Sequence, residues 1–102
     1  MKIPEDYLWK DNSYIAYARN PFITYVITNS SIYVNSGIIN TSSSQISINK
    51  ISACTLKQNL LQKFLGLGTI EIYTIGDAQL SLKLENIRKS DKVRELIMEL
   101  IG

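Results

Sequence analysis

Apolar and polar residues alternate over much of this chain with the period of two that is typical of β-strands. The clearest example is 79–84, in which every second residue is a leucine, so that three leucines share one face. Residues 22–28 and 31–36 are rich in β-branched and aromatic residues, and the polar pair at 29–30 between them predicts a tight turn. These two segments are therefore predicted to form an antiparallel hairpin.

Further strands are predicted on both sides of this hairpin. Residues 13–18 are predicted to form a strand that is joined to the hairpin by a short connection at 19–21. The polar tract 40–44 predicts a loop or hairpin tip, because small hydroxyl residues compete for backbone hydrogen bonds. Alternation resumes at 45–49, which predicts another half-buried strand.

The apolar side of the next strand continues at Ile51, Cys54 and Leu56. The spacing of three between Ile51 and Cys54 breaks strict alternation and predicts a bulge or bend. A lone cysteine in such a run is expected to be a small buried hydrophobe.

Residues 59–65 predict a short helical or irregular turn that is rich in large apolar residues. Two glycines, Gly66 and Gly68, then lead the chain into a strand at 69–74. The large apolar residues of the turn are expected to fold back and close the core: Leu60, Leu61, Phe64 and Leu65.

From Arg88 onward the apolar period changes from two to about 3.6, which predicts an amphipathic helix. Ser90 is the expected N-cap, and Asp91 lies in the first turn, where the helix dipole favours an acid. One face of this helix is apolar and needs a surface to cover: Val93, Leu96, Ile97, Leu100 and Ile101.

Together these elements predict a mainly β fold with a C-terminal α-helix. Seven strands fall roughly within 14–84 and the helix roughly within 90–101, so the expected architecture is a seven-stranded antiparallel barrel or bent sandwich that the helix caps at one open end. A length of 102 residues with 45% apolar residues is enough for one modest core, and the whole of 1–102 is predicted to be a single domain.

The most distinctive residues lie at the predicted corner, which carries Gln58-Asn59-Leu60 and then Phe64-Leu65-Gly66-x-Gly68-Thr69-Ile70. With the hairpin and the terminal helix, this corner resembles the bacterial pleckstrin-homology (PH) domains. The resemblance implies a PH-like barrel and a non-enzymatic module for protein contacts or membrane association, and some members form ring-shaped homo-oligomers. Lipid-binding eukaryotic relatives carry several basic residues on the first hairpin loop. Here that loop offers only Arg19, so a specific phosphoinositide pocket is not expected.

The net charge of +2 hides an asymmetry, because no acidic residue occurs between Asn12 and Ile70. Lys57 and Lys63 lie in this stretch and flank two leucines, Leu60 and Leu61. An apolar tip between bases could enter the headgroup layer of an anionic membrane, although closure of the core by these leucines is the favoured expectation. The candidate surface or lipid contacts are Arg19, Lys57, Leu60 and Lys63.

The residue types present do not favour catalysis. The chain has no histidine and one cysteine, so the sequence predicts no catalytic, cofactor-binding or metal-binding residues and no enzyme activity. Single-stranded nucleic-acid binding is disfavoured because 22–33, the most aromatic region, contains no base to accompany its rings.

The expected function is therefore a non-catalytic interaction or scaffolding module that acts through protein contacts and self-association. The alternative is peripheral association with an anionic membrane surface through the basic middle region. The chain shows no signal-peptide pattern and no stretch near the roughly 18 apolar residues that a membrane span needs, so a cytoplasmic location is expected, with the inner face of the membrane as the site for the alternative. The sequence leaves open the partner, the oligomeric state, the pathway and whether the chain is a piece of a longer protein.

Overall fold

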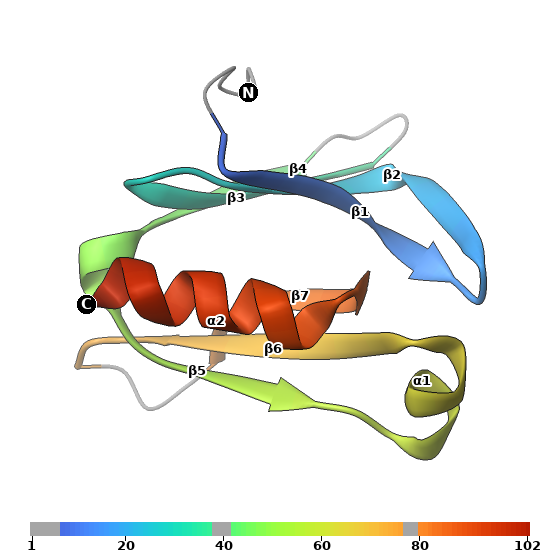
Figure 1. Cartoon of the computed structure of the whole chain (residues 1–102). Coiled ribbons are helices and arrows are strands. Elements are labelled where there is room, and N and C mark those ends of the chain that lie inside the picture. Colours follow the sequence, from blue (N-terminus) through green and yellow to red (C-terminus); the bar gives the residue numbers. More distant parts are fainter. Residues whose placement is uncertain (1–6, 38–41, 77–79) are drawn as a thin grey trace.

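The computed structural model describes residues 7–37, 42–76 and 80–102. In these residues it contains seven β-strands, two α-helices and one 3-10 turn (Figure 1). Their bounds in chain order are β1 Trp9–Ile15, β2 Ala18–Ile27, β3 Ser31–Ser36, β4 Ser42–Ser47, the 3-10 turn η1 Ile48–Lys50, β5 Ile51–Lys57, α1 Leu60–Leu65, β6 Leu67–Thr74, β7 Leu80–Arg88 and α2 Ser90–Ile101.

The strands form two antiparallel sheets, with the strand orders β1-β2-β3-β4 and β5-β6-β7. The sheets face each other, and α2 lies between them (Figure 1). The predicted mainly β fold, with seven antiparallel strands and a C-terminal helix in a bent sandwich, is confirmed. The predicted β2–β3 hairpin is also confirmed, and its turn is closed by the Thr28 amide, which donates to the Ser31 carbonyl at 2.9 Å.

The predicted strand 13–18 is confirmed for residues 13–15, which belong to β1, but its end and the predicted connection at 19–21 are wrong. The turn lies at Ala16 and Tyr17, where Ala16 adopts a positive φ of 55°, and residues 19–21 belong to β2. Asn20 and Pro21 are typical turn residues, but the β1–β2 register shifts between Asn12 and Tyr14, so Pro21 lies in an irregular segment of the ladder. A proline at a bulge removes no ladder hydrogen bond, which is why β2 tolerates it.

The predicted loop at 40–44 is wrong in its second half, because β4 begins at Ser42 and pairs with β3. Paired serines can serve as strand residues when the neighbouring strand supplies the backbone partners. The first part of that loop, and residue 79 of the predicted leucine strand, lie outside the described residues.

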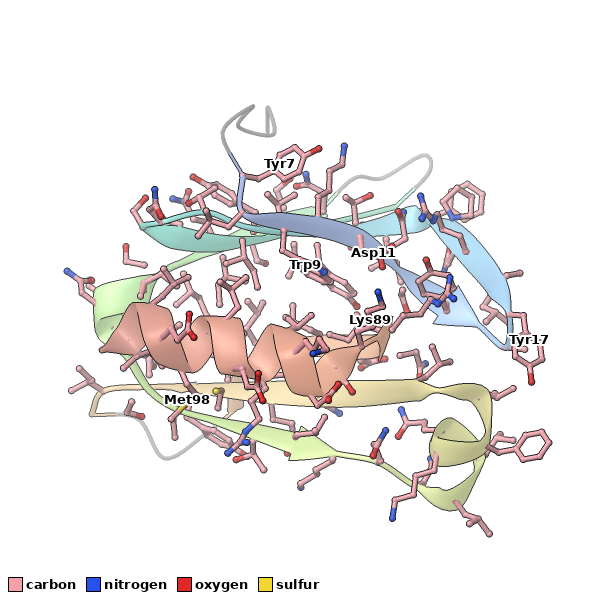
Figure 2. All side chains as sticks on the ribbon, viewed as in Figure 1. Tyr7, Trp9, Asp11, Tyr17, Lys89 and Met98 are labelled. Atoms are coloured by element: carbon pink, nitrogen blue, oxygen red, sulfur yellow. The ribbon has the colours of Figure 1, made fainter. Side chains whose placement is uncertain are left out.

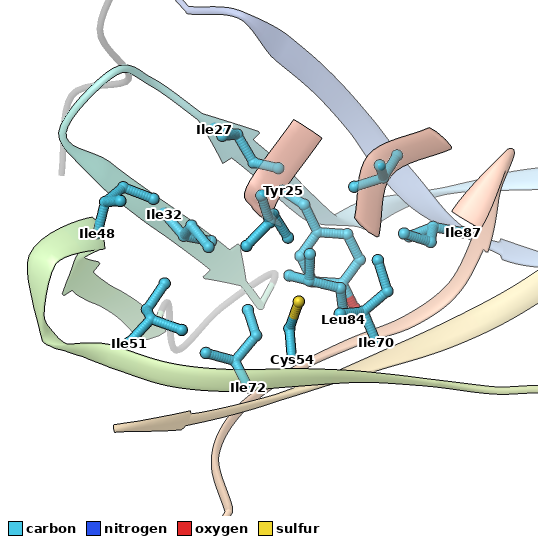
Figure 3. Packing of buried hydrophobic residues seen from close by; sticks show 12 residues of the cluster. Tyr25, Ile27, Ile32, Ile48, Ile51, Cys54, Ile70, Ile72, Leu84 and Ile87 are labelled. Carbon is cyan, nitrogen blue, oxygen red and sulfur yellow. The ribbon is translucent and has the colours of Figure 1, made fainter. Parts of the chain in front are cut away.

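The core lies between the two sheets and against α2 (Figure 3). The predicted bulge is confirmed by a register shift between Ile51 and Ala53 on β5, and both Ile51 and Cys54 are buried as expected. Burial raises the pKa of the Cys54 thiol. The predicted helix face is confirmed too: Val93 and Ile97 are buried, and the other members pack against the cluster, namely Leu96, Leu100 and Ile101.

The predicted N-cap at Ser90 is wrong by one residue. The N-cap is Lys89, in a left-handed conformation with φ 51°, and Ser90 is the first helical residue. Ser90 is buried against Gly68 of β6, so its side chain is held by packing at the point where α2 begins. The position of Asp91 in the first turn is as predicted.

A bulge in β7 joins the two sheets along one side. Gly68 pairs with Ile87 and Ile70 with Leu84, so Glu85 and Asn86 both lie opposite Thr69. The amide of Glu85 donates to the Tyr25 hydroxyl at 3.1 Å, and its carbonyl accepts from the Ser13 hydroxyl at 2.9 Å. Side chains of the first sheet thus satisfy backbone groups that the bulge frees in the second sheet.

Candidate contact surface at the α1 end

The short helix α1 is fixed by its own ends. Asn59 and Gln62 form a capping box: the Asn59 side chain accepts from the Gln62 amide at 2.8 Å, and the Gln62 side chain accepts from the Asn59 amide at 3.0 Å. Gly66 ends the helix in a left-handed conformation with φ 74°. These caps explain how six residues hold a helical turn, as the sequence predicted.

The contacts that attach α1 to the second sheet are polar. The Gln62 side-chain amide donates to the Thr69 hydroxyl at 3.0 Å and to the Asn86 side-chain oxygen at 2.7 Å. Asn86 is the bulge residue of β7 and has a positive φ of 52°, which asparagine tolerates better than most residues. The β7 bulge therefore supplies the side-chain oxygen of Asn86 as the acceptor that attaches α1 to the second sheet.

The apolar side chains of α1 point to solvent. Leu60 is 85% exposed, Leu61 66% and Phe64 79%, whereas Leu65 is partly buried. The prediction that these residues close the core is therefore wrong for the first three. The core is already filled by the strands and α2, so the polar side of α1 faces the sheet and its apolar side remains uncovered.

The end of β1 and the β1–β2 turn, which lie at the same end of the molecule as α1 (Figures 1 and 2), add two more exposed apolar residues. Ile15 is 69% exposed and Tyr17 is 76% exposed. The turn and α1 are neighbours, because Ile15 and Leu61 line the same hollow. We call the five exposed residues the apolar tip: Ile15, Tyr17, Leu60, Leu61 and Phe64.

Two of the predicted contact residues carry compensated charges. The Lys57 ammonium lies 2.9 Å from the buried Glu71 carboxylate, and this interaction raises the pKa of Lys57. Arg19 lies 3.6 Å from Asp11 and donates to the Tyr14 hydroxyl at 3.3 Å, which raises the pKa of Arg19. Both remain exposed, but each already has an internal partner.

The other predicted contacts, Leu60 and Lys63, lie on α1 itself, and Lys63 is exposed with no ion pair to any residue that the structure describes. Sequence reasoning missed Arg88, which is also exposed and lies 5.4 Å from the centroid of the Tyr14 ring. Arg88 belongs to a strand outside the acid-free stretch, and only the pairing of β7 with β6 brings it to this end. It also missed Ile15 and Tyr17: Ile15 ends β1 as an exposed strand residue, and Tyr17 lies in a turn where the pattern predicted a strand.

Two sheets of four and three antiparallel strands, followed by a C-terminal helix, define a PH-like fold. The family model described as "Bacterial PH domain" matches residues 13–101, so the chain belongs to that family and the resemblance seen in the sequence is confirmed. Neither the curated proteins nor the solved structures contain a match. PH domains are generally binding modules without catalytic activity.

Two further observations concern the parts of the chain that the structure describes. None of their helices has both the length and the apolar character needed to cross a membrane. Nor do their cysteine, aspartate and glutamate side chains gather in groups of three or more, as a metal ion would require.

Proposed function

We propose that this bacterial PH domain is a non-catalytic binding module that associates peripherally with anionic membrane surfaces through the apolar tip. The observation that carries the proposal is the orientation of α1, whose polar side chain Gln62 holds the sheet while Leu60, Leu61 and Phe64 project into solvent. A cluster of large exposed apolar residues is typical of an interaction surface, because its burial against a binding partner is favourable.

The charge and the residue types of the apolar tip favour a lipid bilayer as its binding partner. All five tip residues lie between positions 12 and 70, the stretch of sequence without an acid. Two cations with no internal carboxylate partner among the described residues, Lys63 and Arg88, lie beside the tip. Aromatic and leucine side chains next to bases suit the boundary between headgroups and acyl chains, and the anionic inner leaflet of the membrane is the surface we propose.

This proposal changes the roles expected for the lysines. Lys57 forms an ion pair with Glu71, so replacing Lys57 by an acid would place two carboxylates together and destabilise the fold. Lys63 has no such partner among the described residues and is the informative position for a charge reversal.

The test is co-sedimentation with phosphatidylglycerol-containing and with pure phosphatidylcholine vesicles at low and physiological salt. Wild-type protein should bind the anionic vesicles, and less strongly as salt rises. Leu61→Ser with Phe64→Ser should lower binding by more than tenfold, because burial of each such side chain is worth about 1.5–3 kcal/mol. The thermal midpoint should stay close to that of the wild type, since both side chains are already exposed.

Matched controls are available at the opposite end of β6. Ile75 is 67% exposed there, and its amide donates to the Lys50 carbonyl at 2.8 Å. Ile75→Ser should leave vesicle binding unchanged, and Lys50→Glu should weaken it far less than Lys63→Glu. Wild-type binding by the Leu61/Phe64 double variant, or equal effects of the two lysine reversals, would contradict the proposal.

Self-association is the second candidate function. It is supported by β4 and β5, which are edge strands: in the described residues each pairs with a neighbouring strand on one side only. An additional strand from a second copy could pair with either edge. Light scattering on the sample used for the vesicle assay measures the mass in solution. A mass of several subunits that the tip variants leave unchanged would favour self-association through these edges.

A further inference from the structure

We propose that a hollow between α1 and the β1–β2 turn binds one acyl chain of an anionic phospholipid, with Arg88 contacting its phosphate. This inference rests on the proposed function and deepens it, because it names the lipid group that the domain would take from the bilayer. It concerns a site between secondary-structure elements, whereas the apolar tip is a surface that inserts as a whole.

The hollow has two adjoining parts, of about 240 and 170 Å³. Both are lined by the same four residues, which form the shared wall: Tyr14, Ala16, Leu65 and Leu67. The larger part also reaches Leu61 and Asn86, and the smaller part reaches Tyr17 and Arg88. Both parts therefore include residues of the apolar tip, and in the smaller part the cationic side chain of Arg88 lies beside Tyr17.

The size of the hollow favours a slender ligand. Each part is smaller than the roughly 300 Å³ at which pockets for compact small molecules begin. The two parts are neighbours because they share four lining residues, and their small size suits a slender hydrocarbon chain better than a ring system. Leucine and alanine side chains in the shared wall supply an apolar surface for such a chain, and the amide side chains of Asn59, Gln62 and Asn86 line the polar side of the larger part.

The charge at the rim favours a phosphate. Arg88 is exposed and makes no ion pair with any residue in the described parts of the chain. It is held near the Tyr14 ring, 5.4 Å from the ring centroid. Arg19 lies 5.9 Å from the same centroid, but Asp11 already compensates its charge. A guanidinium can form bidentate hydrogen bonds to a phosphate, so Arg88 is the residue that would select an anionic headgroup.

The position of the hollow accounts for the source of the ligand. Ile15, Tyr17 and Leu61 belong to the apolar tip and also line the hollow. If the tip enters a membrane, the hollow is brought to the depth at which acyl chains begin. A chain can then enter it without crossing water, while Arg88 lies at the level of the phosphates.

The test is a nuclear magnetic resonance titration with dihexanoyl-phosphatidylglycerol below its micellar concentration. The expected result is saturable shifts of the amides around the hollow, at Ala16, Leu65, Leu67 and Arg88. Arg88→Gln should weaken binding of this lipid by about tenfold, the loss expected for one charge-assisted contact, and should leave dihexanoyl-phosphatidylcholine unaffected. Inorganic phosphate at the same concentration should not reproduce the shifts, because it cannot fill the apolar part.

A matched pair of variants separates the hollow from the tip. Leu65→Trp should fill the hollow and abolish saturable binding, whereas Leu60→Trp adds the same side chain at a position that lines neither part. Shifts confined to the exposed tip, or equal shifts with inorganic phosphate, would overturn the inference, and with vesicle binding intact they would leave the proposed function standing. Saturable lipid binding without vesicle binding would instead overturn the proposed function alone.

Discussion

Gly68 is the residue on which the close approach of α2 to β6 depends. A Cβ atom added there would lie 2.8 Å from the Ser90 Cβ and 3.1 Å from the Leu56 Cδ1, and it would overlap the Ser90 hydroxyl. Ser90 begins α2 and Leu56 belongs to β5, so one missing side chain lets three elements meet. The glycine is required by this contact and not by its own backbone angle.

Gly68→Ala is therefore expected to destabilise the fold by about 1–3 kcal/mol, the usual cost of overpacking a tight contact. Urea unfolding followed by circular dichroism measures the change. Adding Ser90→Gly removes the opposing Cβ and hydroxyl and should recover part of the loss. Wild-type stability of Gly68→Ala would mean that α2 can shift away from β6 at no cost, against the packing described.

Single residues also show where sequence patterns are reliable. The spacing of Ile51 and Cys54 predicted the β5 bulge because both side chains must reach the core, and burial constrains the backbone. The N-cap was predicted at Ser90 because a small polar residue suits both an N-cap and a buried first position of a helix. The packing of Ser90 against Gly68 distinguishes the two cases, and no local sequence pattern connects these residues, which lie 22 positions apart.

Among the elements, α1 shows how a helix can be positioned by its polar side. Its length of six residues is well below that of a helix that is stable alone, so it depends on its caps and on Gln62. An apolar spacing predicts that one face will be covered, but it does not say whether the cover is the protein's own core or a partner. The sequence prediction that Leu60, Leu61 and Phe64 close the core failed for this reason.

Gln62→Ala is expected to detach α1 while leaving both sheets intact. The variant loses the hydrogen bonds to Thr69 and Asn86 and half of the capping box, a cost of about 1–3 kcal/mol. Hydrogen exchange should show loss of amide protection at the C-terminal end of α1. Lys63→Ala in the same helix is the control and should change stability by no more than about 0.5 kcal/mol. Full protection of α1 in Gln62→Ala would show that other contacts hold it.

On the scale of the whole molecule, the two ends of the sandwich differ in character. One end carries the apolar tip, with Lys63 and Arg88 beside it, and the opposite end carries the η1 turn and Ile75, the residue after β6 (Figure 1). The sequence predicted the strands, the terminal helix and the family, because these follow from periodicity and from the corner motif. It did not predict the tip as a unit, since Ile15 and Tyr17 are more than 40 positions from α1 and meet it only after folding.

The central claim is that the α1 end, and not the opposite end, enters the membrane. In a Trp9→Phe background, which removes the one native tryptophan, Leu60→Trp and Ile75→Trp each provide a single fluorescent reporter at one end. The measurement is quenching by phospholipids brominated on the upper acyl chain, in anionic vesicles that bind the protein. We predict strong quenching and a blue shift for the reporter at position 60 and neither effect for the reporter at position 75. Equal quenching of both reporters, or quenching at position 75 alone, would contradict the account.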